Sequence, residues 1–542
     1  MSNIINSLKD YTTWGKAYQL SLPFNYEVQF SANDPVRLVR SFIARMDLSS
    51  LYKNCRHINK NQATPAQMLA ILVYAYYNKI FSTRGIEEAC HSNIKFMYLL
   101  EGKTAPDHTT IHRFFTKHLR PCIREILAQM GMLLEKLGAV SLTDLFIDGT
   151  KLESRGNKYS FSWRKSVEKN QGKLFAKLPI FLEKTESDLG IHVRHKEANA
   201  MRRLKFLRIQ LLKQIEEKGV VFVHGTGKRK TPLQRTFEEI EVYIARIKDY
   251  TLKLHGMKGR NSYSKTDKDA TFMRMKEDAM KNGQLKPAYN VQYGSNSEFI
   301  LWANVGHQPT DTNTLIPFLR KFKQYYGKFC QNVIADAGYE SEENYSFLEN
   351  NGITSYIKPV SYEMSKTRKW KHDIGRFENM TYIPDEDAYI CANGRKLTVE
   401  KIYNLRTKTG YKIKKTNYAC KDCSNCSVKE NCIHGNHFKK PFEERTKRLS
   451  IAKKFIRQRQ EDLKRITSDE GIELRLNRNI QAEGAFADIK ADLNFRRFLC
   501  WGRKNALVAV VLLAMAHNIQ KLHHKIQRGI VDRHRIPVKQ AA

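Results

Sequence analysis

The spacing of apolar residues predicts helices for most of the N-terminal part of the chain. Apolar residues recur at intervals of three and four through residues 17–135, which is the period of a helix with one buried face. One such face is formed by Leu69, Leu72, Val73 and Tyr76. Thr64 and Pro65 precede it, as an N-cap residue and a first-turn proline do.

Two shorter helices are expected after this one. The first begins near Ser82, and the second begins after Asp107 and carries the run His108–Phe115. Short helices in series, the last with Thr, His and Arg113 near its start, are typical of a helix-turn-helix reader of the DNA major groove. A plain helical bundle has the same pattern. We predict an all-α, helix-turn-helix-like DNA-binding region over residues 1–140, with Arg113 as a DNA contact.

The pattern then changes to strands that alternate with helices. Residues 142–149 and 332–339 each read as a buried strand that ends in an acid. Two further strands, 288–293 and 298–305, are separated by a short polar turn and predict an antiparallel hairpin. The other expected elements are helices at 312–325 and 341–350 and a strand at 353–357.

Residues 164–285 interrupt this series with a charged, mostly helical stretch. Its two apolar seams are Leu204, Leu207, Leu211 and Ile215, and then Leu233, Phe237, Ile240, Ile244 and Ile247. The intervening Gly225–Arg229 superficially resembles a phosphate-binding loop, but Arg229 stands where such a loop has Ser or Thr. We therefore expect a helical hairpin inserted into a larger domain.

Residues 358–450 break the pattern again with short strands and clustered cysteines, and residues 451–525 return to basic helices. The longest apolar run, Ala506–Ala516, is shorter than the roughly 20 residues of a membrane span. It predicts a buried helix. The polar segment Met1–Lys16 lacks the apolar stretch of a signal peptide, which predicts a cytoplasmic protein with reduced thiols and no membrane partner.

The charge of the chain identifies the class of partner. Among 542 residues, 93 Lys and Arg against 55 Asp and Glu give a formal net charge of +38. Solubility alone needs a net charge of only about 2–8 in a small domain. A field of this strength attracts polyanions. Nucleic acid is therefore the expected partner, and an ordinary enzyme of acidic metabolites is disfavoured.

Three acids are the candidates for catalysis. Asp148 and Asp336 each end an apolar run and are followed by Gly within two residues, and Glu483 lies on a later helix. Acids at the edge of a mixed sheet and on a helix packed against it can hold two Mg²⁺ or Mn²⁺ ions, which activate phosphodiester bonds. Each acid alone could equally be a turn or cap residue. The rival acids are Asp144, Asp311, Asp488 and Asp492.

Several segments resemble bacterial insertion-sequence transposases of the DDE type. They are Asp148–Lys151, Pro287–Gln292, Ala335–Tyr339, Glu483 with Lys490, and Pro106–Ile111. The resemblance covers most of the chain, and the order of the motifs makes it specific. It implies that Asp148, Asp336 and Glu483 bind the catalytic metal ions and that Lys490, seven residues after Glu483, contacts DNA on the same helix face.

Pattern and resemblance together predict an α/β fold with an RNase-H-like mixed sheet. The core segments would be 141–163, 286–357 and 451–525. The other parts would be the helix-turn-helix-like region (1–140), a charged helical insertion (164–285), a Cys-rich insertion (358–450) and a basic tail (526–542).

The sequence departs from the resemblance just before Glu483. Many relatives have Tyr and Arg seven and four residues before this Glu, where the present chain has Leu476 and Asn479. Arg475 and Arg478 are close by, but neither can be given the same role from the sequence. We therefore predict Arg478 only as a candidate DNA contact.

Further basic residues lie close to the proposed acids. Arg496, Arg497, Arg503 and Lys504 flank Trp501, and Arg164 and Lys165 follow Trp163. Basic groups interleaved with aromatic rings are suited to phosphates and unpaired bases, although a solvated basic face has the same composition. Arg496 and Arg497 are the DNA contacts that we select from this set. Tyr339 could stack on a base or pack against the following helix.

The cysteine spacing points to a structural metal site. Cys420, Cys423, Cys426 and Cys432 follow the pattern C-x2-C-x2-C-x5-C, with Cys391 upstream and His434 and His437 downstream. Closely spaced thiols in a reducing compartment favour structural Zn²⁺ over an iron–sulfur cluster or no metal. Because Cys391 is an alternative ligand, the ligand set stays open.

The sequence thus predicts a DNA transposase that binds terminal inverted repeats, cleaves DNA with metal ions and joins the element to target DNA. Since two DNA ends need two active sites, we expect a homodimer on double-stranded DNA. The alternatives are an RNase-H-like nuclease without strand transfer and an inactive DNA-binding protein with a zinc module.

Overall fold

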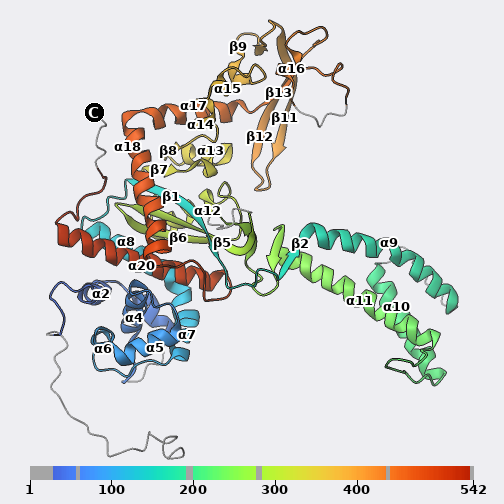
Figure 1. Cartoon of the computed structure of the whole chain (residues 1–542), viewed down its shortest axis with the longest axis horizontal. Helices are drawn as coiled ribbons and strands as arrows, with labels where there is room; N and C mark the ends of the chain where they lie inside the picture. Colours follow the sequence, from blue (N-terminus) through green and yellow to red (C-terminus); the bar gives the residue numbers. More distant parts are fainter. Residues whose placement is uncertain (1–28, 56–60, 191–198, 276–282, 435–439, 537–542) are drawn as a thin grey trace, which may run out of the picture.

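The computed structural model describes residues 29–55, 61–190, 199–275, 283–434 and 440–536. A helical N-terminal region packs beneath a central mixed sheet, and a helical arm extends to one side. A smaller sheet lies at the end of the molecule opposite the N-terminal region (Figure 1).

The N-terminal helices begin where the sequence places caps. They are α2 (Pro35–Ala44), α3 (Ser49–Asn54), α4 (Pro65–Tyr77), α5 (Thr83–Ser92), α6 (Ile94–Leu100) and α7 (His108–Arg113). Thr64 and Gln67 form a reciprocal capping box at α4, and the Asp107 carboxylate accepts a 2.6 Å bond from the Thr110 amide at α7. Residues 1–28, including the start of the predicted helical stretch, lie outside the described residues.

The helix expected to end a helix-turn-helix unit is longer than predicted. Helix α7 continues without a break through the π-helical turn η3 (Phe114–Leu119) into α8 (Arg120–Lys136). The later part of this rod contacts β6 and α20 of the central domain. The N-terminal region is therefore joined to the central sheet through a shared apolar core.

The central sheet has six strands and mixed pairing. They are β1 (Asp144–Glu153), β4 (Thr271–Arg274), β5 (Leu285–Asn296), β6 (Phe299–Gly306), β7 (Asn332–Ala335) and β8 (Thr354–Ile357). The order is β4-β5-β1-β7-β8, with β6 also on β5. Strand β1 is antiparallel to β5 and parallel to β7, and β7 is parallel to β8.

Three sequence predictions for this sheet are wrong in detail. Strand β1 continues to Glu153, so Asp148 lies inside the strand rather than at its end. The hairpin turns at Ser297 and Glu298, both with positive φ, rather than over four residues. Strand β4 belongs to the sheet although its sequence falls within the stretch assigned to the helical insertion.

Helix α20 (Arg503–Arg528) is the main apolar support of the sheet. The predicted buried run Ala506–Ala516 lies within it and is buried throughout. Asn518 accepts a bond from the Ile300 amide and donates to the Ile300 carbonyl, at 2.7 and 2.8 Å. By length and composition α20 could cross a membrane, but 83% of its most apolar window is buried inside the protein. It is a core helix.

Two shorter helices complete the surroundings of the sheet. They are α12 (Leu315–Tyr326), which contacts α8, and α13 (Glu342–Asn350), which contacts β8. Between β7 and α13 lies the single 3₁₀ turn η4 (Ala337–Tyr339).

The charged stretch forms three helices rather than the predicted hairpin. They are α9 (Arg164–Asp188), α10 (Ala200–Glu217) and α11 (Pro232–Met257). Their leucine and isoleucine seams form an apolar cluster separate from that of the sheet, and the helices extend as an arm in Figure 1. Strands β2 (Phe161–Trp163) and β3 (Ser262–Ser264) pair at the base of this arm.

The cysteine-rich segment contains a second, antiparallel sheet of five strands. They are β9 (Thr381–Ile383), β10 (Ala388–Ile390), β11 (Lys396–Arg406), β12 (Lys412–Cys420) and β13 (Arg448–Ile451). The short helical elements are α14 (Tyr362–Ser365), α15 (Arg368–Lys371), η5 (Phe377–Asn379) and α16 (Lys429–Cys432). The prediction of only short strands is wrong, because β11 and β12 form a long paired ribbon.

The segment that carries Glu483 is a helix with two π-helical turns. Its parts are α18 (Asp469–Arg478), η6 (Asn479–Glu483), α19 (Gly484–Ala487) and η7 (Asp488–Asp492). A separate helix, α17 (Lys453–Thr467), precedes it and ends at the extended Ser468. The predicted basic tail begins inside α20, and its described part packs back on the protein. Arg535, for example, forms an ion pair of 2.9 Å with Asp144 on β1.

Two helical glycines test the packing of this fold. A Cβ at Gly131 in α8 would overlap the Tyr326 hydroxyl of α12, whereas a Cβ at Gly172 in α9 would have no neighbour within 4 Å. We expect Gly131→Ala to lower the free energy of unfolding by about 1–3 kcal/mol through overpacking. Gly172→Ala should raise it by roughly 0.5–1 kcal/mol through helix propensity.

Thermal unfolding of the two variants beside the wild type measures both effects. Equal melting temperatures for the two alanine variants would contradict the close approach of α8 and α12.

Candidate active site

The pairing of β1 with β7 places Asp148 and Asp336 on neighbouring strands. The last residues paired in register are Ile147 and Ala335, and each acid follows directly. Phe146 and Ile334, two residues earlier, share an apolar cluster with residues of α17, α18 and η6. Because side chains alternate between faces of a sheet, both acids are directed toward the face that these helices cover.

Local backbone bonds hold both carboxylates. Asp148 Oδ1 accepts a bond of 2.8 Å from the Gly149 amide. Asp336 Oδ1 accepts one of 2.7 Å from the Ala337 amide and so caps η4. Asp148 is largely buried, with 15% of its side chain exposed.

Glu483 is linked to Asp148 by an arginine. The Arg478 guanidinium lies 2.7 Å from Glu483 Oε1 and 4.0 Å from Asp148 Oδ1. Arg478 is itself mostly buried, whereas more than half of the Glu483 side chain is exposed. Two carboxylates of the proposed triad are thus bridged by one cation of the chain.

A π-helical turn between Arg478 and Glu483 determines which arginine reaches the Glu483 carboxylate. In a regular α-helix, residues four apart face the same side, and residues five apart do not. The turn η6 spans Asn479–Glu483 and accommodates one extra residue. Arg478, five residues before Glu483, therefore reaches the Glu483 carboxylate, while Arg475 stacks on the Tyr362 ring at 5.4 Å.

A buried polar cluster adjoins the two aspartates. Asp311, on the loop before α12, accepts bonds from Asn290 and Gln292 of β5, at 2.6 and 3.1 Å. Tyr339 is fully buried beside it. Burial, together with the charges of Asp311, Asp148 and Asp336, raises the pKa of Tyr339 well above its ordinary value. The sequence named Asp311 only as a rival acid and did not identify Asn290 or Gln292 as partners.

The other rival acids have different surroundings. Asp144 is paired with Arg535 and accepts a 2.8 Å bond from Asn332. Asp488 lies 3.1 Å from Lys521 and 3.4 Å from the buried His517 of α20. Asp492 is exposed at the end of η7. The first two are therefore engaged in packing the helices against the sheet.

The basic residues that we predicted as DNA contacts differ in their burial and in their partners. Arg497 pairs with Glu153 at 3.7 Å and donates to backbone carbonyls after β1, whereas Arg496 is exposed. Lys490 is half-buried inside η7, so the uniform α-helix assumed from its spacing to Glu483 is not observed. Trp501 stacks on Arg155 at 5.2 Å and is 43% exposed.

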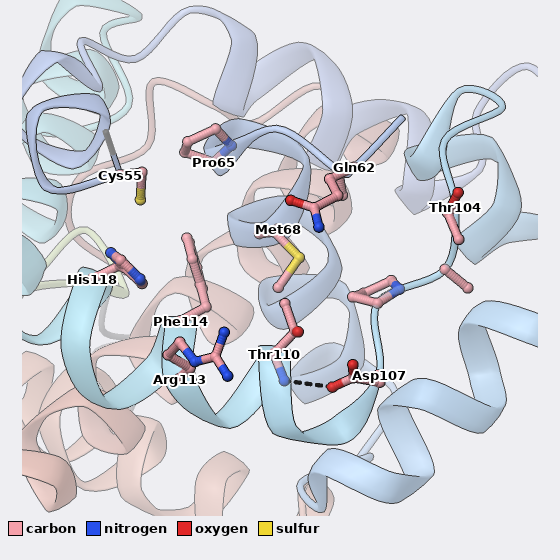
Figure 2. Close-up of a pocket in the computed structure, with 13 residues that line it drawn as sticks. Cys55, Gln62, Pro65, Met68, Thr104, Asp107, Thr110, Arg113, Phe114 and His118 are labelled. Atoms are coloured by element: carbon pink, nitrogen blue, oxygen red, sulfur yellow. Dashed lines mark hydrogen bonds between the residues drawn. The ribbon is translucent and has the colours of Figure 1, made fainter. Parts of the chain in front are cut away.

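Arg113 lies far along the chain from these residues, at the wall of a pocket in the N-terminal region. Figure 2 shows its side chain beside Phe114 and Thr110, with Met68 behind them. The Asp107–Thr110 cap bond forms part of the rim. Arg113 is exposed, so its guanidinium is accessible to a phosphate.

The cysteines gather at one corner of the second sheet. Cys391 follows β10, Cys420 ends β12, and Cys432 ends α16. Burial and the neighbouring Cys423 raise the pKa of Cys420 to about 11, and its thiol lies 3.0 Å from the Asp422 carbonyl as a donor. Cys423 accepts a bond of 3.3 Å from the Lys447 amide. His434 lies 3.3 Å from Asp373, and His437 is outside the described residues.

Within the part of the chain that the structure describes, no three His, Cys, Asp or Glu side chains are already arranged to hold a metal ion. The carboxylate oxygens of Asp148, Asp336 and Glu483 are of the type that Mg²⁺ prefers. Arg478 supplies a positive charge between Asp148 and Glu483. At the cysteines, the donor type suits Zn²⁺.

Comparison with known proteins gives two family matches. A model described as a transposase DDE domain matches residues 390–523, and a model described as a transposase domain (DUF772) matches residues 24–117. Both matches are to transposase models, and together they support an insertion-sequence transposase of the DDE type. No curated protein and no solved structure matches it.

The two matches cover different parts of the transposase. The DDE match contains Glu483, Lys490 and strands β11 to β13 of the cysteine-rich sheet, and the other match contains Arg113. Asp148 and Asp336 lie outside both segments. Their assignment therefore depends on their place in the sheet.

The bridge made by Arg478 predicts how the transposase responds to divalent ions. In Arg478→Gln, Asp148 and Glu483 lose the cation between them, so we expect a lower melting temperature at low salt without metal. The loss should be about 1–3 kcal/mol, as for a charged hydrogen bond of this burial. Added Mg²⁺ should raise the melting temperature of this variant more than that of the wild type.

Arg475→Gln is the matched control, because Arg475 lies on the same helix but stacks on Tyr362. Its response to Mg²⁺ should equal that of the wild type. The same Mg²⁺ response in all three proteins would rule out the bridging role of Arg478.

Proposed function

We propose that this transposase cuts the ends of its element and joins them to target DNA at a centre formed by Asp148, Asp336 and Glu483. The observation that carries the proposal is the adjacency of two aspartates on the parallel strands β1 and β7, with Glu483 linked to Asp148 through Arg478. Both reactions are in-line phosphoryl transfers, for which divalent ions supply charge neutralisation and an activated oxygen nucleophile.

The strand order supports an RNase-H-like core for this enzyme. An antiparallel series, β6-β5-β1, is followed by the parallel strands β7 and β8. In our proposal, the arm α9–α11 and the second sheet are insertions into this core. The N-terminal region would bind DNA, with Arg113 as one contact.

Several side chains would act on the DNA. Asp148, Asp336 and Glu483 would hold the ions, and Lys490, Arg496 and Arg497 would contact phosphates near the cleaved bond. Neutralising phosphates releases counterions, so binding to inverted-repeat DNA should weaken as salt rises. Because each active site processes one end, we propose a homodimer in the complex with two ends. The cytoplasm is the proposed location.

A nuclease without strand transfer would use the same carboxylates. The two activities are separated by supplying a pre-cut inverted-repeat end with a free 3′-hydroxyl, which only a transposase joins to a second duplex. An inactive DNA-binding protein would retain binding and neither cut nor join.

The proposed triad makes a direct prediction. Asp336→Ala and Glu483→Ala should each reduce Mg²⁺-dependent cleavage and joining of inverted-repeat ends by more than about 100-fold, because each removes an oxygen donor from the reacting centre. Asp492→Asn, a change at an exposed acid of the same helical segment, is the control and should cut at the wild-type rate. Wild-type cleavage by either alanine variant would disprove the triad.

For the second sheet we propose a structural zinc ion held by Cys420, Cys423, Cys426 and Cys432, with Cys391 as an alternative ligand. The proposal is supported by the number of thiols at one corner and by the small apolar core beneath them, since a bound ion can supply the folding free energy that little buried surface lacks.

Elemental analysis of the purified protein should give one zinc and no iron per chain. A chelator should then lower the melting temperature of the wild type but not that of Cys423→Ser. Metal-free protein with an unchanged melting temperature would exclude this site.

A further inference from the structure

Asp311 is a fourth carboxylate at the proposed centre, fixed in place from the side of β5. It accepts hydrogen bonds from Asn290 and Gln292, which are only 2% and 1% exposed. In the sheet register, Gln292 is paired with Gly149, the residue after Asp148. The carboxylate of Asp311 is therefore held against β1 at Gly149, the residue that follows Asp148 in the strand.

Glycines next to both aspartates make room for this carboxylate. A Cβ on Gly149 would lie 2.9 Å from Asp311 Oδ1, and a Cβ on Gly338 would lie 3.4 Å from Asp311 Oδ2. Thr312 also donates a 3.0 Å bond to the Gly338 carbonyl. The glycine that follows each aspartate within two residues, a feature of the sequence, thus allows one acid to approach both strands.

Two buried polar atoms beside Asp311 have no hydrogen-bond partner among the described residues. They are the Tyr339 hydroxyl and Gln292 Oε1. Tyr339 is fully buried, and its hydroxyl would lie 3.2 Å from the same Gly149 Cβ that would touch Asp311. An unpaired buried hydroxyl destabilises the folded protein. Such a group, next to the Asp311 carboxylate, indicates a ligand with both charge and hydrogen-bonding capacity.

We propose that Asp311 and Tyr339 are positioning residues for a hydrated divalent cation at this centre. The inference rests on the proposed function and extends it from three side chains to five. Mg²⁺ retains water ligands when proteins bind it, and these waters need acceptors and donors in a fixed arrangement. The Asp311 carboxylate would accept a hydrogen bond from a metal-bound water, and the unpaired Tyr339 hydroxyl would form a second hydrogen bond to such a water. Asn290 and Gln292 hold the Asp311 carboxylate in a fixed orientation.

A purely structural role for Tyr339 predicts a different effect of its substitution on metal binding. If the ring only fills the core, Tyr339→Phe keeps the packing and removes an unpaired hydroxyl, so stability rises and metal binding is unchanged. If the hydroxyl serves the cation, stability again does not fall, but metal binding does. Metal affinity therefore separates the two roles.

The experiment measures Mn²⁺ binding to the full chain without DNA by electron paramagnetic resonance. Tyr339→Phe and Asp311→Asn should each weaken binding by about 10–100-fold, the usual effect of losing a group that orients metal ligands. Tyr339→Phe should melt at or above the wild-type temperature. In cleavage of inverted-repeat ends, both variants should need more Mg²⁺ for half-maximal rate.

Two matched controls test for non-specific effects of changing buried groups. Tyr345 is another buried tyrosine, and it packs against Phe455. Tyr345→Phe should leave Mn²⁺ affinity unchanged. Asp144→Asn changes a buried acid at the other end of β1 and should lower stability without altering Mn²⁺ affinity.

The possible failures are distinguishable. Wild-type Mn²⁺ affinity in both Tyr339→Phe and Asp311→Asn, together with lost binding in Asp336→Ala, would overturn this inference and leave the triad intact. A wild-type protein that neither binds Mn²⁺ nor cuts inverted-repeat ends would overturn the proposed function and the inference with it.

Discussion

The structure of the centre depends on the parallel pairing of β1 with β7. This pairing places two aspartates on adjacent strands, where their negative charges repel unless a cation lies between or beside them. The chain supplies one such cation, the Arg478 guanidinium, which also holds Glu483. Like-charge repulsion at this position is therefore reduced by an arginine that is itself mostly buried.

The remaining parts of the molecule serve this pairing in different ways. Helix α20 and the N-terminal rod share one apolar core with the sheet, which fixes the strands. Helices α17 and α18 contact β8 and β7 and precede the segment that ends in Glu483. The arm and the second sheet have apolar clusters of their own. They can therefore vary without disturbing the register of β1 and β7.

Local signals in the sequence predicted most elements but not all of their limits. The caps at Thr64 and Asp107 are confirmed, since capping depends on neighbouring residues. The predicted end of β1 was wrong because its pairing with β7 stops at Ile147, whereas its pairing with β5 continues to Glu153. A strand limit set by a distant partner leaves no local signal. Strand β4 was not predicted for the same reason. Its short apolar stretch forms strand hydrogen bonds only with β5.

The sequence by itself determined the polyanion partner, the family and the candidate acids, since charge, motif order and residue chemistry are properties of the linear chain. Only the tertiary structure decided which acids meet. Asp144, Asp311 and Asp148 are chemically alike in the sequence, yet one pairs with Arg535, one is held by Asn290 and one borders Arg478. Their surroundings are formed by residues up to several hundred positions away. A carboxylate's role follows from the charges and hydrogen-bond donors around it, and these are brought together by folding.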